Sequence, residues 1–267
     1  MKDITVIVPV HNVTGNFNEW FEKAIKSIKE QKSIPGKILL VHCVCPGVKE
    51  RLETFDYGDL NYEIIENPGA PDFASQVNYG VSQTETKWFS VLEFDDEYSN
   101  IWFKNVEEYI NSYPEVGLFL PLVVETSEKG EFLGFTNEAV WAMNFSEKLG
   151  HLDNSVLLNF QNFQTSGMVM DKETYEEIGG IKPNIVLSFV YEFLLRATYN
   201  DVKVMTVPKV GYRHTNMRED SLFWTYKNSE KHRLEPEVAK FWIDAAKKEY
   251  FFKNDRQITY TEGHKVV

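Results

Sequence analysis

Along most of the chain, short continuous runs of apolar residues alternate with segments in which apolar residues recur at helical spacing. Short runs of β-branched and aromatic residues are typical of strands that are buried on both faces. Between them, apolar residues recur every three or four positions, which predicts amphipathic helices. The expected strands are Ile4–Val10, Lys37–Val44, Tyr62–Ile65, Trp88–Leu92, Val116–Glu125, Ser166–Met170 and Val202–Val207. The expected helices are Phe17–Ile28, Phe73–Val81, a segment from Asn100 to Tyr113, Lys172–Ile178 and Leu187–Tyr199. Strands that alternate with helices in this way predict an α/β fold with a mainly parallel sheet.

The remaining segments have weaker patterns. Residues 126–162 show no clean period, and we interpret them as extra strands and loops. Gly211–Ser221 is polar and charged, as expected of a loop, and Leu222–Lys253 has the apolar spacing of an amphipathic helix. Without a repeat or a linker, we predict one domain over residues 1–230 and a C-terminal helical extension over residues 231–267 that packs on it.

Composition narrows the class of protein. The net charge is −12, although residues 201–267 are mildly basic. The sequence has no run of roughly 18 apolar residues, so we predict no membrane span. The first strand pattern begins without a signal-peptide cleavage site. Cys43 and Cys45 are two positions apart, which we expect to be too close for an ordinary disulfide and too few for a zinc site. We therefore predict a reduced, cytoplasmic protein, in the host cytoplasm if a phage encodes it.

Candidate chemistry gathers at Trp88–Ser99, whose sequence is WFSVLEFDDEYS. An apolar strand ends there in three carboxylates, Glu93, Asp95 and Asp96. Residues i and i+2 of a strand share a face, so Glu93 and Asp95 are expected to point the same way. A solvated acidic turn is the plain alternative. If the carboxylates are buried, a hard divalent cation with a bound phosphate would compensate their charge.

Other polar residues are predicted at the same edge of the sheet. Ligands of parallel α/β sheets bind beyond the carboxyl ends of the strands. His11 follows the first strand and a turn at Cys43–Pro46 follows the second, so both are expected near the acidic group. A structural, hydrogen-bonded histidine is the alternative for His11.

Four stretches resemble family 2 glycosyltransferases of the GT-A fold. ITVIVPVHN is similar to the opening strand of that family, and ENPGAPDFASQVNYGVSQTETKWFSVLEFDDEYS to the run that ends in its DxD strand. SGMVMDKETYEEIGGIKPN resembles the acceptor-side segment, and YEFLLRATYNDVKVMTVPKVGYRH the closing region. The resemblance implies a GT-A-like, Rossmann-like sheet flanked by helices. It also implies transfer of a sugar from a nucleoside-diphosphate sugar to an acceptor hydroxyl, with inversion and with Mn²⁺ or Mg²⁺.

The resemblance also implies site residues. The nucleotide-sugar ligands would be Pro9, His11, Asn12, Asn78, Glu93, Asp95, Arg213 and Arg218. The metal ligands would be Asp95, Asp96 and His214, where the alternative for His214 is a surface position. Forked arginine donors suit phosphate oxygens, although a solvated loop is an equal explanation for Arg213 and Arg218. We expect Gly211–Ser221 to order over the bound diphosphate.

Three positions depart from the family pattern. Glu93 replaces the first DxD acid, and His42, Cys43 and Cys45 stand where acids usually help to bind the nucleotide. Phe189 and Val190 replace the Glu-Asp pair that usually supplies the catalytic base. Glu192 is then a candidate base, with an ion pair to Arg196 at i+4 as its structural alternative, and Asp220 and Glu219 are further candidates.

Two other functions stay open from the sequence. The lost Glu-Asp pair permits a catalytically silent GT-A domain that serves as a binding or scaffold module. The basic last quarter permits a phage-type DNA glycosyltransferase that acts on hydroxymethylated bases, against which the net charge of −12 speaks. The acceptor could thus be a saccharide, a protein or a modified DNA base.

Overall fold

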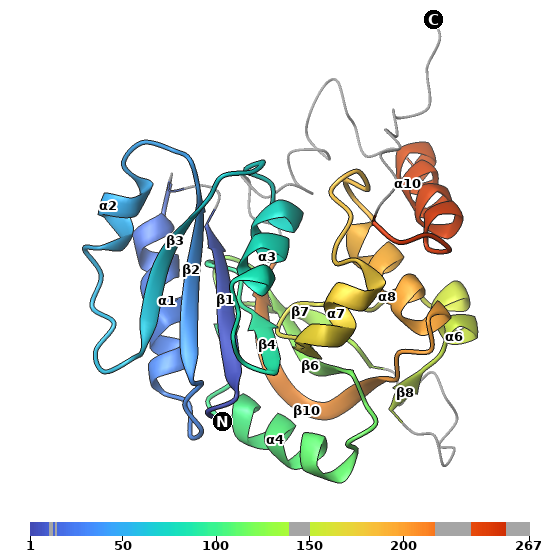
Figure 1. Cartoon of the computed structure of the whole chain (residues 1–267), viewed down its shortest axis with the longest axis horizontal. Coiled ribbons are helices and arrows are strands. Elements are labelled where there is room, and N and C mark those ends of the chain that lie inside the picture. The colour runs from blue at the N-terminus through green and yellow to red at the C-terminus, as the bar shows by residue number, and fades with distance from the viewer. Residues whose placement is uncertain (11–12, 14, 139–149, 217–235, 255–267) are drawn as a thin grey trace, which may run out of the picture.

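The computed structural model describes residues 1–10, 13, 15–138, 150–216 and 236–254. A mixed sheet forms its centre, with helices on both faces (Figure 1). The strands are β1 (Ile4–Val10), β2 (Lys37–Cys43), β3 (Tyr62–Asn67), β4 (Trp88–Val91), β5 (Glu97–Tyr98), β6 (Leu118–Thr126), β7 (Phe132–Thr136), β8 (His151–Leu152), β9 (Val169–Asp171) and β10 (Val204–Thr215). The helices are α1 (Phe17–Lys29), α2 (Val48–Leu52), α3 (Phe73–Ser82), α4 (Trp102–Ser112), α6 (Asn154–Asn159), α7 (Lys172–Ile178), α8 (Phe189–Tyr199) and α10 (Pro236–Glu249). The predicted α/β fold class is confirmed.

The main path of the sheet runs in the order β3-β2-β1-β4-β9-β6-β10-β5. The first four of these strands are parallel, as β-branched runs with crossover helices predict. Strand β9 is antiparallel to both β4 and β6, and β10 is parallel to β6. Strand β7 pairs with β6 and β8 pairs with β10, both antiparallel. Residues 126–162 therefore contribute the extra strands that we expected.

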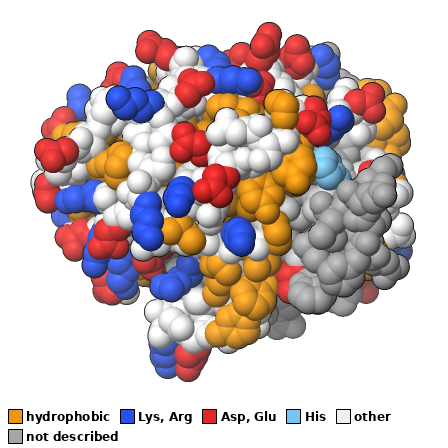
Figure 2. Space-filling model, turned by 90° about the horizontal axis from the view of Figure 1, so that it is seen from below, with side chains coloured by type: hydrophobic (Ala, Val, Ile, Leu, Met, Phe, Trp, Pro, Cys, Tyr) orange, Lys and Arg blue, Asp and Glu red, His pale blue; other side chains and the backbone are white. Residues whose placement is uncertain are grey.

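Two apolar cores lie on opposite faces of the sheet. Helices α1, α2 and α4 cover one face, α3, α7 and α8 cover the other, and α10 packs against α8 (Figure 1). Helix α3 approaches the sheet closely because Gly80 has no side chain: a Cβ there would lie 2.7 Å from Ile7 Cγ2 and 3.0 Å from Val41 Cγ2. Among the described helices, none is long and apolar enough to cross a bilayer. On the face shown in Figure 2, acidic and basic side chains are interspersed around a band of hydrophobic side chains.

Local signals set several element ends correctly. Asp171 caps α7 as predicted, since its Oδ1 accepts the Thr174 N–H at 2.9 Å. Gly179, with φ of 91°, ends the same helix in the left-handed conformation. The prediction of a loop from Gly211 is wrong up to Thr215, because β10 continues to that residue through pairing with β5 and β6. Of the predicted helix Leu222–Lys253, Pro236–Glu249 is α10, and residues 222–235 lie outside the described residues.

Candidate active site

The acidic residues Glu93, Asp95 and Asp96 lie in a turn after β4, not at the end of a longer strand. Strand β4 ends at Val91, and the Asp96 N–H donates to the Glu93 carbonyl at 3.1 Å, which closes a turn. Residues in a turn no longer alternate between two faces. The prediction that Glu93 and Asp95 share one face of a strand is therefore wrong, because the turn brings Glu93 together with Asp96 instead.

Glu93, Asp96 and His214 form a compact group of potential metal ligands. Their ligand atoms all lie within 4.8 Å of one another. His214 comes from β10, and its Nδ1 lies 2.9 Å from Asp96 Oδ2. The Thr215 N–H donates to the other oxygen, Asp96 Oδ1, at 2.7 Å. The structure thus unites two predicted metal residues, Asp96 and His214, with an acid from the start of the same turn.

The protonation of His214 depends on the carboxylates around it. Asp96 is 1% exposed, so its carboxylate needs a positive or hydrogen-donating partner. Burial lowers the pKa of His214, but Asp96, through its charge and its hydrogen bond, and then Glu93 and Glu125 outweigh burial and raise that pKa well above the ordinary value. This shift favours the protonated imidazole when no cation is bound. A divalent cation would replace that proton as the positive charge among the carboxylates.

The donor set fits a hard or borderline divalent cation. Two carboxylates and one imidazole suit Mn²⁺ well, and Mg²⁺ prefers all-oxygen sets. Tyr212 stabilises the acidic turn, because its hydroxyl oxygen accepts the Glu93 N–H at 3.0 Å. Burial, followed by the charges of Asp96 and Glu93, raises the pKa of Tyr212, so its hydroxyl stays neutral.

Asp95 and Arg213 line a neighbouring cavity of about 650 Å³. Asp95 is absent from the compact ligand group, although its backbone carbonyl accepts the Thr215 Oγ1–H at 2.9 Å. The exposed Arg213 guanidinium lies 3.6 Å from the Glu97 carboxylate. The cavity lies between α1, β5 and the β6–β7 turn, and its cationic lining residues are Lys23, Lys26, Lys129 and Arg213.

A hydrogen-bonded chain extends from Glu93 to Glu125, and sequence reasoning missed it. Ser166 Oγ donates to Glu93 Oε1 at 3.0 Å and contacts Gln164 Oε1 at 3.2 Å. Gln164 Nε2 donates to Glu125 Oε1 at 2.7 Å, and Asn216 Nδ2 donates to Glu125 Oε2 at 3.1 Å. No spacing in the sequence signals this chain, because its members come from four distant segments.

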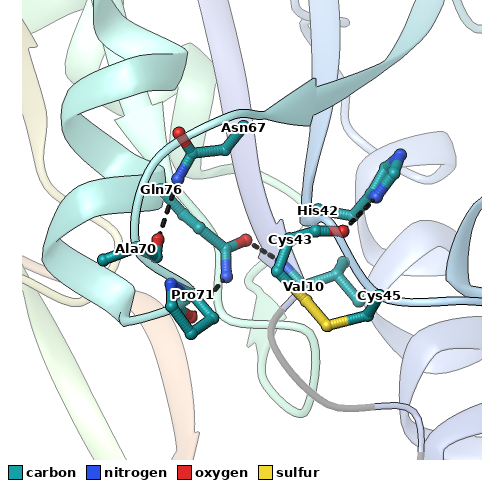
Figure 3. Close-up of a disulfide and its surroundings, with 8 residues drawn as sticks. All are labelled: Val10, His42, Cys43, Cys45, Asn67, Ala70, Pro71 and Gln76. Carbon is teal, nitrogen blue, oxygen red and sulfur yellow. Dashed lines mark hydrogen bonds between the residues drawn. A yellow bond between two sulfur atoms is a disulfide. The ribbon is translucent and has the colours of Figure 1, made fainter.

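The carboxyl ends of β1, β2 and β3 meet at the other end of this edge (Figure 3). The Val10 N–H donates to Gln76 Oε1 at 3.0 Å, and Gln76 Nε2 donates to the Pro71 carbonyl at 2.9 Å. Predicted Pro9 is buried one residue before, opposite Val41 in β2. The predicted ligands His11 and Asn12 lie outside the described residues.

The prediction for the two cysteines is wrong. A disulfide joins Cys43 to Cys45 (Figure 3). The strand ends at Cys43 and the Cys45 N–H donates to the Cys43 carbonyl at 2.8 Å. This tight turn sets the two Cα atoms 5.4 Å apart, within the range that disulfides span. The cysteines therefore no longer argue for a reduced setting.

Glu192 lies in a buried ion-pair network. The network contains the predicted partner Arg196 and also Lys182. The carboxylate is fully buried, and its Oε1 lies 2.9 Å from Arg196 Nε and 3.1 Å from Lys182 Nζ. Arg196 Nη2 donates to Oε2 at 3.0 Å. Lys182 also lies 3.5 Å from Glu249 in α10, which ties the C-terminal helix to α8. A base must reach the acceptor oxygen. The burial and pairing of Glu192 favour its structural alternative, and its role as the base stays a prediction.

Asn78 is also used within the protein. Its Nδ2 donates to the Ile181 carbonyl at 2.8 Å, while its Oδ1 accepts the Ile181 N–H at 2.9 Å and the Tyr175 hydroxyl at 2.5 Å. These bonds join α3 to the turn after α7, which gives Asn78 a role in packing, and its contact with the nucleotide stays a prediction. The predicted residues Arg218, Glu219 and Asp220 lie outside the described residues.

Known structures share this architecture. S. aureus TarS 1-349 in complex with UDP is 15% identical, with a TM-score of 0.59 over 93% of this chain and 72% of that one. The same protein in complex with UDP-GlcNAc gives 13% identity and a TM-score of 0.61 over 94% and 68%. Mannosyltransferase PcManGT from Pyrobaculum calidifontis, in complex with GDP-Man and Mn²⁺, gives 14% and 0.62 over 92% and 64%. At these identities the likeness shows the fold.

Sequence comparison supplies the family. No curated protein matches the chain. The model of glycosyl transferase family 2 matches residues 5–178, which span β1 to the end of α7. This match covers more than half of the 267 residues and includes the acidic turn with Glu93 and Asp96, whereas His214 lies beyond it. The chain therefore belongs to glycosyl transferase family 2.

Proposed function

We propose that the protein transfers a sugar from a nucleoside-diphosphate sugar to an acceptor hydroxyl, with a divalent cation at Glu93, Asp96 and His214. The compact arrangement of these three ligands at the carboxyl edge of the sheet carries the proposal. Family membership supports the reaction class. The complexes of PcManGT with GDP-Man and Mn²⁺ and of TarS with UDP-GlcNAc support the kinds of donor and cation.

Each side chain then has a defined task. Glu93, Asp96 and His214 would hold the cation, which supplies positive charge for the leaving diphosphate. Tyr212 and Ser166 keep Glu93 in place through hydrogen bonds at 3.0 Å each. Arg213, exposed beside Asp95 in the cavity, is available to pair with donor phosphate oxygens.

Inverting transfer also needs a base for the acceptor hydroxyl. With Glu192 enclosed by Lys182 and Arg196, we propose Asp220 for this task, with Glu219 as its neighbour in sequence. Asp220→Asn should reduce turnover by about 10²–10⁴-fold, the usual contribution of a general base, with little change in donor affinity. A fully active Asp220→Asn enzyme would refute this assignment.

Metal-dependent donor binding tests the proposal most directly. Calorimetry with UDP-GlcNAc and GDP-Man as probes should detect binding with Mn²⁺ and lose it with a chelator. Asp96→Asn should weaken the Mn²⁺-dependent affinity at least about tenfold, since it removes a charged ligand. Asp95→Asn is the matched variant in the same turn: if it is the only one of the two that matters, the ligand set is misassigned.

A binding module is the second candidate, and one observation favours it. The first turn of α8 carries Phe189 and Val190 in place of an acid pair. Its buried acid, Glu192, forms ion pairs with Lys182 and Arg196. Such a protein would bind a nucleotide sugar in the presence of Mn²⁺ without turnover. Release of nucleoside diphosphate above the rate without enzyme, measured with either donor, would exclude this candidate.

A further inference from the structure

The cysteine pair lies at the carboxyl ends of β1, β2 and β3, on the edge of the sheet beyond which ligands of parallel α/β folds bind (Figure 3). We propose that Cys43 and Cys45 form a thiol–disulfide exchange site whose oxidation state alters the affinity for a nucleoside diphosphate. The inference rests on the proposed function of this edge of the sheet. A small dithiol reduces the pair, and a glutathione-type disulfide reoxidises it.

Access to the two sulfur atoms differs. Cys43 is only 2% exposed at the end of β2, whereas Cys45 is half-buried. Val44, between them, is 62% exposed, so the turn projects toward solvent. A thiolate must approach the sulfur that it attacks. Cys45 Sγ is therefore the site of attack, and Cys43 is the leaving group.

The exchange balances with one dithiol. A thiolate of the dithiol attacks Cys45 Sγ and breaks its bond to Cys43, which leaves as a thiolate and takes up a proton. The second thiolate of the reductant then attacks the reductant sulfur of the mixed disulfide and releases Cys45, which is also protonated. The protein gains two electrons and two protons, and the dithiol becomes a cyclic disulfide.

The turn is coupled to its surroundings through backbone atoms. The Cys43 carbonyl accepts both the Cys45 N–H at 2.8 Å and His42 Nδ1–H at 2.7 Å. The Cys45 carbonyl accepts the Val48 N–H at 3.3 Å, which begins α2. The disulfide closes a short ring around this turn. Reduction would let the residues before Val48 sample more conformations, beside the end of β1 that Gln76 supports.

A nucleotide that contacts a loosened edge must order it on binding, and that cost lowers affinity. We expect the reduced protein to bind UDP or GDP, with Mn²⁺, about three- to tenfold more weakly than the oxidised protein. Reoxidation with glutathione disulfide should restore the higher affinity.

The experiment compares the two redox states of one preparation. Thiols are counted by alkylation and mass spectrometry, and the Kd of UDP and of GDP is measured calorimetrically after dithiothreitol is removed without oxygen. The double variant Cys43→Ser/Cys45→Ser should show the weaker affinity under both conditions. If it does not fold, Cys45→Ser, which changes only the half-buried position, serves the same purpose.

The outcomes are distinct. A difference in affinity that follows the thiol count and vanishes in the variant supports the proposal. Equal affinity in both states, or two thiols that glutathione disulfide cannot join, would overturn it while the proposed function stands. If neither state binds UDP or GDP with Mn²⁺, the proposed function itself fails, and the coupling fails with it.

Discussion

Replacing Glu192 with glutamine separates a structural from a catalytic role. The wild-type carboxylate accepts hydrogen bonds from Arg196 and lies 3.1 Å from Lys182 Nζ, with all three side chains nearly or fully buried. Glutamine keeps the size but removes the charge. Its amide N–H₂ would also face donors that cannot accept a hydrogen bond.

The expected loss of stability depends on which hydrogen-bond acceptors Arg196 and Lys182 keep in the variant. Breaking a buried ion pair by removing one partner costs about 3–5 kcal/mol, because a buried charge loses its compensation. Arg196 would keep the carbonyls of Ile178 and Gly180 as acceptors, and Lys182 would keep the Glu249 carbonyl at 2.8 Å. We therefore expect the lower end, about 3 kcal/mol, which corresponds to a decrease in Tm of roughly 6–12 °C at this chain length.

The assay combines denaturant unfolding with turnover of the folded variant. Glu19→Gln is the matched control, since Glu19 forms an exposed i,i+4 pair with Lys23 at 2.7 Å. It should leave the denaturation midpoint nearly unchanged, because solvent screens this exposed pair. Stability loss with nearly unchanged kcat would confirm the structural role of Glu192. Unaltered stability with turnover reduced about 10²–10⁴-fold would refute it and restore Glu192 as the base.

Three further variants test the site and the fold. Asp96→Asn should abolish most Mn²⁺-induced thermal stabilisation, and an unchanged shift on adding Mn²⁺ would speak against the ligand group. Tyr212→Phe removes the acceptor of the Glu93 N–H, so unfolding should become easier by about 1 kcal/mol and Mn²⁺ binding modestly weaker; denaturant titration with and without Mn²⁺ measures both, and no change in either would mean that the turn does not depend on this bond. Gly80→Ala places a methyl group 2.7 Å from Ile7 and should destabilise the fold by about 1–3 kcal/mol, read from the denaturation midpoint; a neutral effect would show that α3 can shift outward.

Much of the fold follows from local patterns in the chain. Strand β1 and its parallel neighbours could be predicted because a β-branched run buried on both faces leaves a continuous apolar signature. The cap at Asp171 could be predicted because a side chain and an N–H three residues later decide it. Asp96 was a candidate metal ligand from the acidic end of its own stretch, whereas His214 was found only through the family resemblance, since no local pattern relates two residues so far apart.

Tertiary structure decided the rest. Gly211–Thr215 is a strand despite its polar sequence, because backbone pairing with β5 and β6 stabilises it without an apolar pattern. Glu93 replaced Asp95 in the ligand group because a backbone hydrogen bond ended the alternation of β4. Glu192 is enclosed partly by Lys182, which no helical spacing relates to it. Periodicity reports on neighbours along the chain, whereas the charge and access of a carboxylate depend on atoms that only folding brings close.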